Sequence, residues 1–460
     1  MNPTGRAAFF DEIIRSHERV GVERPASSPL GIVSICSAHP WVLQAAMRQL
    51  AGLGTPLLVE STCNQVNQFG GYTGMTPEDF VRFVYNLAGQ VGFPQELILL
   101  GGDHLGPFVW QDEPAERAMH KSLELVSAYV RAGYVKIHLD ASMKLADDPP
   151  GALPVEVSAR RAAELAGASE AAWAEKRQAG QPAIAAPRYV IGTEVPVAGG
   201  AKAGGEAVSV TSLPSLIETI EATRQAFCQA GLEAAWERVV AVVVQPGVEY
   251  GDDYVLNFQP EAACQLASFI ETQPHLVYEA HSTDYQTPQA LRALVENHFA
   301  ILKVGPGLTF AFREAVFALA WMEAEWLGNR AGVQLSHLPE VLDTVMQADP
   351  KDWRKYYRGD EQALRFARKY SFSDRSRYYW PYPQVRDALE TLFKNLERYP
   401  APLALLSQFM PEQYAHLRAG KLSNQPREWV YDRVSGVLAG YLQATSQAFG
   451  PACDQVYLSV

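Results

Sequence analysis

Short, continuous runs of apolar residues recur along the chain from residue 31 to residue 307, and each run ends in polar residues or glycine. Segments with apolar residues at helical spacing, such as 40–54 and 76–92, separate most of these runs. Continuous Val, Ile and Leu runs are typical of strands buried on both faces, and their alternation with helices indicates parallel pairing. The predicted strands lie within residues 31–38, 56–62, 96–104, 134–143, 188–196, 238–247, 275–284 and 299–307.

Eight strand and helix units in about 280 residues match the size of a (β/α)8 TIM barrel. A doubly wound open sheet has a similar rhythm, but no G-x-G-x-x-G motif follows any run, which counts against the dinucleotide-binding form of that fold. We therefore expect an α/β protein in which residues 1–310 form a (β/α)8 barrel. Residues 311–460 are expected to supply the closing barrel helix and an α-helical C-terminal extension packed on the barrel.

Three segments depart from the simple alternation. Residues 144–187 are long and alanine-rich, and we interpret them as the fourth crossover helix with an enlarged entry. The glycine-rich segment 198–210 is long enough to form a lid over a site. Two glycines precede Asp103 and His104, and they predict an abrupt turn that carries this acid and imidazole into the mouth of the barrel.

Composition narrows the function classes. The formal net charge of -12, without a cluster of Lys or Arg, argues against a nucleic-acid partner. Five scattered cysteines without a C-x-x-C motif indicate neither a disulfide framework nor a zinc ribbon. No apolar stretch has the character of a signal peptide or the length of a membrane span. We expect a soluble protein of the reducing cytoplasm.

Polar side chains follow the predicted strands at the point where each strand ends. The carboxyl ends of the strands of a parallel barrel meet at one face, so these residues are expected to converge there. Six of the eight ends carry Asp, Glu or His, whereas a chain that had only to fold would end its strands in turn residues. The polar set is Cys36, His39, Glu60, Asp103, His104, His138, Asp140, Glu194, Gln245, Glu279, His281, Ser282 and Lys303.

Histidine nitrogen with carboxylate or amide oxygen is a typical ligand set for Zn, Mn, Co or Ni. We therefore expect a divalent metal site, with His104 and His281 as the main ligands. Glu194 and Gln245 are the next candidates. His138 alternates with apolar residues, and it is either a hydrogen-bond partner of a ligand or a packed core histidine.

Several longer motifs resemble one family. They are TCNQVNQFGGYTGMTP, GGDHLGP, KIHLDASM, GTEVP, VQPGVEYG, YEAHSTDYQT and LKVGPGLTFAFREA. Over roughly residues 10–450 the chain is similar to the tagatose-bisphosphate aldolase Z-subunit (GatZ/KbaZ-like) family, which includes ketohexose 4-epimerases. More distantly, it resembles the class II aldolases. That likeness implies Asp103 as an acid/base, and His104 and His281 as zinc ligands. It also implies Glu194 as a glutamate near the metal, while Gln245 stands where a class II aldolase has another zinc histidine.

Together with sugar chemistry, the resemblance favours a metal-dependent ketohexose 4-epimerase that interconverts D-tagatose and D-fructose, free or phosphorylated. Inversion at C4 would proceed by retro-aldol cleavage and re-addition, because the C4 hydrogen is not activated by the C2 carbonyl and no nicotinamide motif is present. A metal would stabilise the enediolate. We expect Asp103 to move the proton, with Asp140 or Glu249 on the opposite face. The candidate substrate contacts are Asn67, Ser142, Ser282, Asp284, Lys303 and Gly305, the last two for the far end of the sugar or its phosphate.

Two other functions stay open at this point. The chain could be a non-catalytic subunit that stabilises a Y-type class II D-tagatose-1,6-bisphosphate aldolase, and it would then be inactive alone. It could also be an aldolase in its own right, recognised by released triose. The expected ligand of a catalytic chain is a ketose or ketose phosphate, and we also expect a homo-oligomer.

Overall fold

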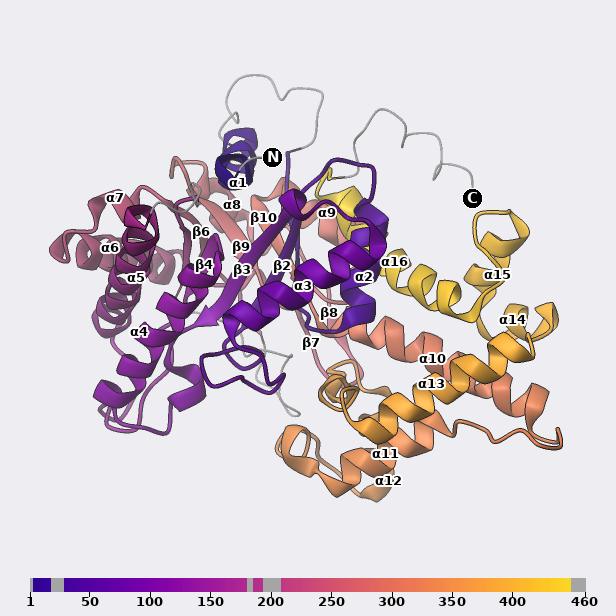
Figure 1. Ribbon diagram of the computed structural model, residues 1–460. Helices are drawn as coiled ribbons and strands as arrows, with labels where there is room; N and C mark the ends of the chain where they lie inside the picture. The colour runs from indigo at the N-terminus through magenta and orange to yellow at the C-terminus, as the bar shows by residue number, and fades with distance from the viewer. Residues whose placement is uncertain (1–2, 18–28, 180–184, 193–207, 448–460) are drawn as a thin grey trace.

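The computed structural model describes residues 3–17, 29–179, 185–192 and 208–447 (Figure 1). Eight parallel strands close into a barrel in the order β1-β10-β9-β6-β5-β4-β3-β2. Each predicted apolar run overlaps one of these strands, so the predicted TIM-barrel fold is confirmed. The barrel strands are β1 Ile32–Ile35, β2 Leu57–Thr62, β3 Ile98–Leu105, β4 Lys136–Leu139, β5 Arg188–Ile191, β6 Val239–Val243, β9 Val277–Ala280 and β10 Phe299–Val304.

Helices surround the barrel and connect successive strands, as the alternating pattern predicts (Figure 1). The start of α3 (Pro77–Val91) shows that the local sequence specifies where a helix begins. The side chains of Thr76 and Asp79 each accept a hydrogen bond from the backbone N–H of the other, in a capping box. A small antiparallel ribbon, β7 Glu249–Tyr250 with β8 Val255–Leu256, follows β6. The connecting elements are α2 Pro40–Leu50, α3 Pro77–Val91, η1 Gln95–Leu97, η2 Pro107–Trp110, α4 Ala115–Ala132, α5 Val155–Gln178, α6 Leu213–Gln229, α7 Glu233–Trp236, α8 Cys264–Ile270, α9 Pro288–Glu296 and α10 Pro306–Leu327.

The amino-terminal end of the barrel is closed by α1, which spans Pro3–His17. Phe10, Ile13 and Ile14 of this helix pack into one buried cluster with the first residues of the strands, among them Ile32 and Leu58. Each such side chain contributes roughly 1.5–3 kcal/mol by leaving water. In Figure 1, α1 lies at the end of the barrel away from α11 (Leu338–Ala348) and α12 (Glu361–Tyr370). Access to the barrel is therefore from the carboxyl ends of the strands.

The C-terminal part of the chain is helical, as predicted. Its last helix, α16, packs on α2, α9 and α10, so that the extension and the barrel share one apolar core. The predicted boundary at residue 310 falls inside α10. The elements of the extension are α11 Leu338–Ala348, η3 Pro350–Asp352, α12 Glu361–Tyr370, η4 Arg375–Tyr378, α13 Pro383–Arg398, α14 Leu403–Phe409, α15 Pro411–Arg418 and α16 Pro426–Ala444.

The two glycines before Asp103 do not form the predicted turn, because both lie within β3. A Cβ on Gly101 would lie 2.7 Å from Cγ of Glu60, and a Cβ on Gly102 would overlap the Leu105 side chain. Glycine is required at both positions because neighbouring side chains lie directly against the backbone there. The change of direction comes from a bulge in the pairing of β3 with β4, between Gly102 and Leu105. His104 lies in this bulge with a φ of 48°.

Two other expectations concern the lid segment and a membrane span. The proposed lid, 198–210, lies outside the described residues except for its last three positions. Across the described ranges, no helix combines the length and apolar character needed to cross a membrane.

Candidate functional site

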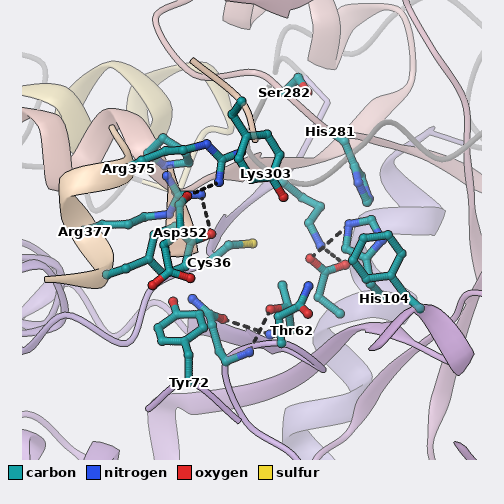
Figure 2. A pocket seen from close by; sticks show the side chains of 18 of the residues that line it. Cys36, Thr62, Tyr72, His104, His281, Ser282, Lys303, Asp352, Arg375 and Arg377 are labelled. Carbon is teal, nitrogen blue, oxygen red and sulfur yellow. Dashed lines mark hydrogen bonds and ion pairs between the residues drawn. The ribbon is translucent and has the colours of Figure 1, made fainter. Parts of the chain in front are cut away.

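A cavity of about 380 Å³ opens at the carboxyl ends of the barrel strands. Its floor comes from the ends of the strands, and its roof from the C-terminal extension around η3 and η4. Figure 2 shows His104, His281 and Lys303 gathered on one side and Asp352, Arg375 and Arg377 on the other. The polar floor residues are Cys36, Thr62, Asp103, His104, His281, Ser282, Asp284 and Lys303, and the roof residues are Asp352, Lys355, Tyr356, Arg375, Arg377 and Tyr378.

A network of buried ion pairs lies at the floor of this cavity. Lys136 of β4 has its Nζ 2.6 Å from Oε1 of Glu60 and 2.7 Å from Oε2 of Glu279. Lys303 of β10 has its Nζ 2.9 Å from Oε2 of Glu60 and 3.5 Å from Oε1 of Glu279. Lys303 also pairs with Asp103 of β3. Five strands, β2, β3, β4, β9 and β10, thus contribute charges to one network.

Opposite charges favour the ionised forms of Asp103, Glu279, Lys136 and Lys303. Burial raises the pKa of Asp103, but the charges of His104 and Lys303 outweigh it and hold that pKa well below its usual value. Burial also raises the pKa of Glu279, which Lys136 and Lys303 hold well below its usual value. Burial lowers the lysine pKa values, yet the facing carboxylates keep that of Lys136 raised and that of Lys303 well above its usual value. At neutral pH, carboxylates therefore face ammonium groups.

His104 lies between two carboxylates. Its Nδ1 is 2.8 Å from Oδ2 of Asp140, and its Nε2 is 3.7 Å from Oδ2 of Asp103. Burial lowers the pKa of His104, but the two carboxylates outweigh this effect and raise the pKa above its usual value. The Ser142 hydroxyl donates to the other oxygen of Asp140, at 2.7 Å. This arrangement favours an imidazolium on the cavity wall, which can donate a hydrogen bond to a ligand.

Asp103, His138, Glu279 and His281 form a group suited to a metal ion. One ligand atom of each lies within 4.8 Å of those of the other three, and all four residues are buried. Nδ1 of His138 is 3.0 Å from Oδ1 of Asp103 and 3.3 Å from the backbone N–H of His104, and in the tautomer whose Nδ1–H donates to Asp103, Nε2 keeps its lone pair. This Nε2 is buried without a hydrogen-bond partner in the described chain, as expected of a metal ligand. Burial lowers the pKa of His281 to about 3, so this imidazole is neutral as coordination requires.

The charge balance also favours a cation. The four buried carboxyl groups of Glu60, Asp103, Asp140 and Glu279 outnumber the three cationic groups of Lys136, Lys303 and His104. A bound cation would add positive charge to this acid-rich site, and the donor atoms suit Zn, Mn, Co or Ni. Of the predicted ligands, His281 belongs to the group, and the ring of His104 lies beside it with centroids 5.0 Å apart. The residues present therefore fit the divalent metal that the sequence predicts.

Several predicted site residues lie away from the cavity. Gln245 and Asn67 use their side-chain oxygens to accept backbone N–H groups of their own loops. Ser142 bonds to a carboxylate of the site, as described above, and does not line the cavity. Glu249 does not line it either, and burial raises the pKa of its carboxyl. Glu194 lies outside the described residues.

The other predicted substrate contacts, Ser282, Asp284, Lys303 and Gly305, line the cavity. Oδ1 of Asp284 accepts the backbone N–H groups of Gly305 at 3.0 Å and Gly307 at 2.7 Å, at the start of α10. Burial raises the pKa of Asp284 to about 6, although these two hydrogen bonds oppose the shift. Ser282 has a φ of 55°, a left-handed conformation that costs a non-glycine residue about 1–3 kcal/mol and is common at functional sites.

Sequence reasoning left Glu279 out of the predicted ligands. The signal was present, because Glu279 lies two residues before His281 and the period of a strand places both on one side. Arg375 and Arg377 were missed for a different reason. They follow no barrel strand, and only the path of the C-terminal extension brings η4 over the cavity.

Known proteins match almost the whole chain. A family model described as D-tagatose-1,6-bisphosphate aldolase subunit GatZ/KbaZ-like matches residues 18–446. The D-tagatose-1,6-bisphosphate aldolase subunit GatZ of Salmonella heidelberg is 50% identical over 430 residues, which are 94% of this chain and 97% of that protein. The GatZ subunit of Klebsiella pneumoniae is 50% identical over 414 residues, covering 90% and 95%. A crystal structure described as a probable tagatose 6 phosphate kinase from Sinorhizobium meliloti has a TM-score of 0.81 and 45% identity, and the match covers 90% of this chain and 100% of that one.

These matches correct the leading interpretation of the sequence. The expected ketohexose 4-epimerase is wrong, because relatives 50% identical along nearly their whole length are named as subunits of D-tagatose-1,6-bisphosphate aldolase. The resemblance to the Z-subunit family is confirmed. The chain belongs to the GatZ/KbaZ-like family of D-tagatose-1,6-bisphosphate aldolase subunits.

Proposed function

We propose that this chain is the Z-type subunit of a class II D-tagatose-1,6-bisphosphate aldolase, in which it stabilises a catalytic partner subunit in the cytoplasm. The observation that carries the proposal is its 50% identity to subunits of that name over 97% of their length. Such a role requires a surface that binds another chain, because a stabilising subunit acts only through contact.

An exposed aromatic face on α10 and α12 supports this role. Trp321 is 42% exposed, Phe366 52% and Tyr370 42%. Phe317 lies one turn before Trp321 on α10, and its ring meets the Tyr370 ring edge-on with centroids 6.2 Å apart. The Phe366 and Tyr370 rings are 5.7 Å apart. Exposed apolar groups gathered in this way mark interaction sites, and we assign this aromatic face to the catalytic subunit.

Co-expression with a Y-type class II aldolase subunit tests the proposal. We expect the two chains to elute as one complex in size-exclusion chromatography with light scattering, and the partner to unfold at a higher temperature inside it. Changing Trp321 and Phe366 together to serine should abolish the complex. The control is Leu403→Ser, which removes an equally exposed apolar side chain on α14. Separate elution of the two wild-type chains at micromolar concentration would reject the assignment.

We also propose that Asp103, His138, Glu279 and His281 hold a Zn, Mn, Co or Ni ion. A bound ion of this kind supplies a Lewis acid, which stabilises negative charge on a carbonyl or enediolate oxygen. The chain's own groups would orient the ligand beneath the roof: the imidazolium of His104 donates a hydrogen bond from the cavity wall.

The polar cavity favours a second candidate function, an aldolase acting in its own right. A subunit that only stabilises a partner needs neither the group of potential metal ligands nor a cavity of about 380 Å³ above it. Incubating the purified chain with D-tagatose 1,6-bisphosphate and detecting triose phosphate distinguishes the two functions. Release of triose that is lost in His281→Ala would support the aldolase. No release from the chain alone, with full activity after addition of the partner, would support the stabilising subunit.

A further inference from the structure

The roof of the cavity carries positive charge. It presents Lys355, Arg375 and Arg377 against the single carboxylate of Asp352, a net charge of two. In Figure 2, the two arginines and Asp352 lie together on the side of the cavity away from His104. These residues come from the C-terminal extension, which the fold of the barrel does not require.

Arg375 is buried and forms no direct ion pair with a carboxylate of the described residues, and the nearby Asp352 carboxyl acts on it only at longer range. Its side chain is 3% exposed, and the guanidinium carbon lies 3.0 Å from the centroid of the Tyr356 ring. Nη1 donates to the backbone carbonyl oxygen of Asp352 at 3.2 Å. Nε has no hydrogen-bond partner among the residues that the structure describes. A buried guanidinium whose Nε lacks an acceptor would be stabilised by a ligand that supplies one.

Within the described chain, the hydrogen bonds of the Arg377 guanidinium go to uncharged acceptors. Its Nη1 donates to two backbone carbonyl oxygens and its Nη2 to the Tyr378 hydroxyl at 2.9 Å. The nearby carboxylate of Asp374 is taken by Arg313, at 3.0 Å. Lys355 is exposed at the rim, with its Nζ 5.2 Å from the centroid of the Tyr356 ring. Positive charge in the roof is thus available to an anion.

On the floor, in contrast, the groups that could bind an anion are already paired with carboxylates of the chain. The N-terminus of α10, a common position for phosphate, already receives the carboxylate of Asp284 through the N–H groups of Gly305 and Gly307. Lys303 pairs with three carboxylates. A phosphoryl group placed there would meet like charges, so the roof is the favourable end of the cavity for it.

We propose that Arg375, Arg377 and Lys355 bind the phosphoryl group of a phosphorylated ketose whose hydroxyl and carbonyl oxygens face His104 and His281. Guanidinium groups bind phosphate oxygens in pairs, and the cavity has the size of a small-molecule site. The inference goes beyond the proposed subunit role, because it concerns this chain alone and needs no partner.

Isothermal titration calorimetry of the full purified chain tests the site with three probes: D-tagatose 6-phosphate, D-tagatose and inorganic phosphate. We expect the sugar phosphate to bind at least about 10-fold more tightly than either of the other two. Arg375→Met and Arg377→Met should each weaken it by at least about 10-fold. Lys355→Met, at an exposed position, should weaken it about 3-fold. Arg365→Met, on an exposed position of α12, is the matched control and should change nothing.

Two results would count against the proposed phosphoryl site. Unchanged affinity in both Arg377→Met and Lys355→Met would overturn the proposal, even if Arg375→Met failed to fold. Inorganic phosphate that binds as tightly as the sugar phosphate would overturn the ketose assignment and leave a site for free phosphate. These titrations use the chain alone, so a missing complex with the catalytic subunit would not alter them, and a missing phosphate site would not alter the complex.

Discussion

Replacing Lys136 by methionine tests the buried charge network most directly. Lys136 is 0% exposed, and its Nζ bridges Glu60 and Glu279 at 2.6 and 2.7 Å. Methionine keeps the shape of the side chain but leaves the two carboxylates facing each other without this positive charge. Removing one partner of a buried ion pair costs about 3–5 kcal/mol. That is a large part of the free energy of unfolding, which is roughly 5–15 kcal/mol for a typical folded protein.

The assay is urea unfolding at neutral pH, followed by fluorescence and circular dichroism, for the wild type, Lys136→Met and the double variant with Glu279→Gln. We expect the single variant to lose about 3–5 kcal/mol, and the double variant to regain part of it because one unpaired charge is gone. Lys394→Met, at a site 71% exposed, should stay within about 0.5 kcal/mol of the wild type. A loss below about 1 kcal/mol in Lys136→Met would refute an ionised, water-free network.

Three further outcomes are expected. The pKa of Asp284 is raised to about 6 in the folded chain, so the folded state prefers the protonated carboxyl group. The stability that this preference gives is complete below the unfolded pKa and is lost as the pH rises through 6. Asp284→Asn keeps the acceptor oxygen but does not titrate, so its free energy of unfolding, measured in urea, should rise relative to that of the wild type by up to about 3 kcal/mol from acidic to neutral pH; a difference that does not change with pH would contradict the shift. A Cβ on Gly106 would overlap a backbone carbonyl oxygen, so Gly106→Ala should lower the unfolding temperature, while Gly89→Ala, in open space on α3, should not. Zinc or manganese should raise the unfolding temperature of the wild type and of His120→Ala, whose side chain is 74% exposed, but not of His281→Ala; equal shifts in all three would exclude the metal site.

Much of the candidate site followed from one rule of the fold. Strands of a parallel barrel bring their carboxyl ends to one face, so the order of residues along the chain was enough to place Asp103, His104 and His281 together. The rule says nothing about which atoms meet. The bulge in β3 turns His104 toward Asp140. The alternating pattern left two roles open for His138, whose Nε2 has no hydrogen-bond partner among the described residues.

The sequence by itself determined the eight strands, their order of appearance and the helical C-terminal extension, because burial imposes a local period that each segment carries alone. Only the tertiary structure decided the contacts between strands and the roof above them. Glu60 meets Lys136 across a glycine, and Arg375 lies over the barrel mouth, through pairings of segments far apart in the chain. No local period records such pairings, since they depend on register and packing that exist only once the chain has folded.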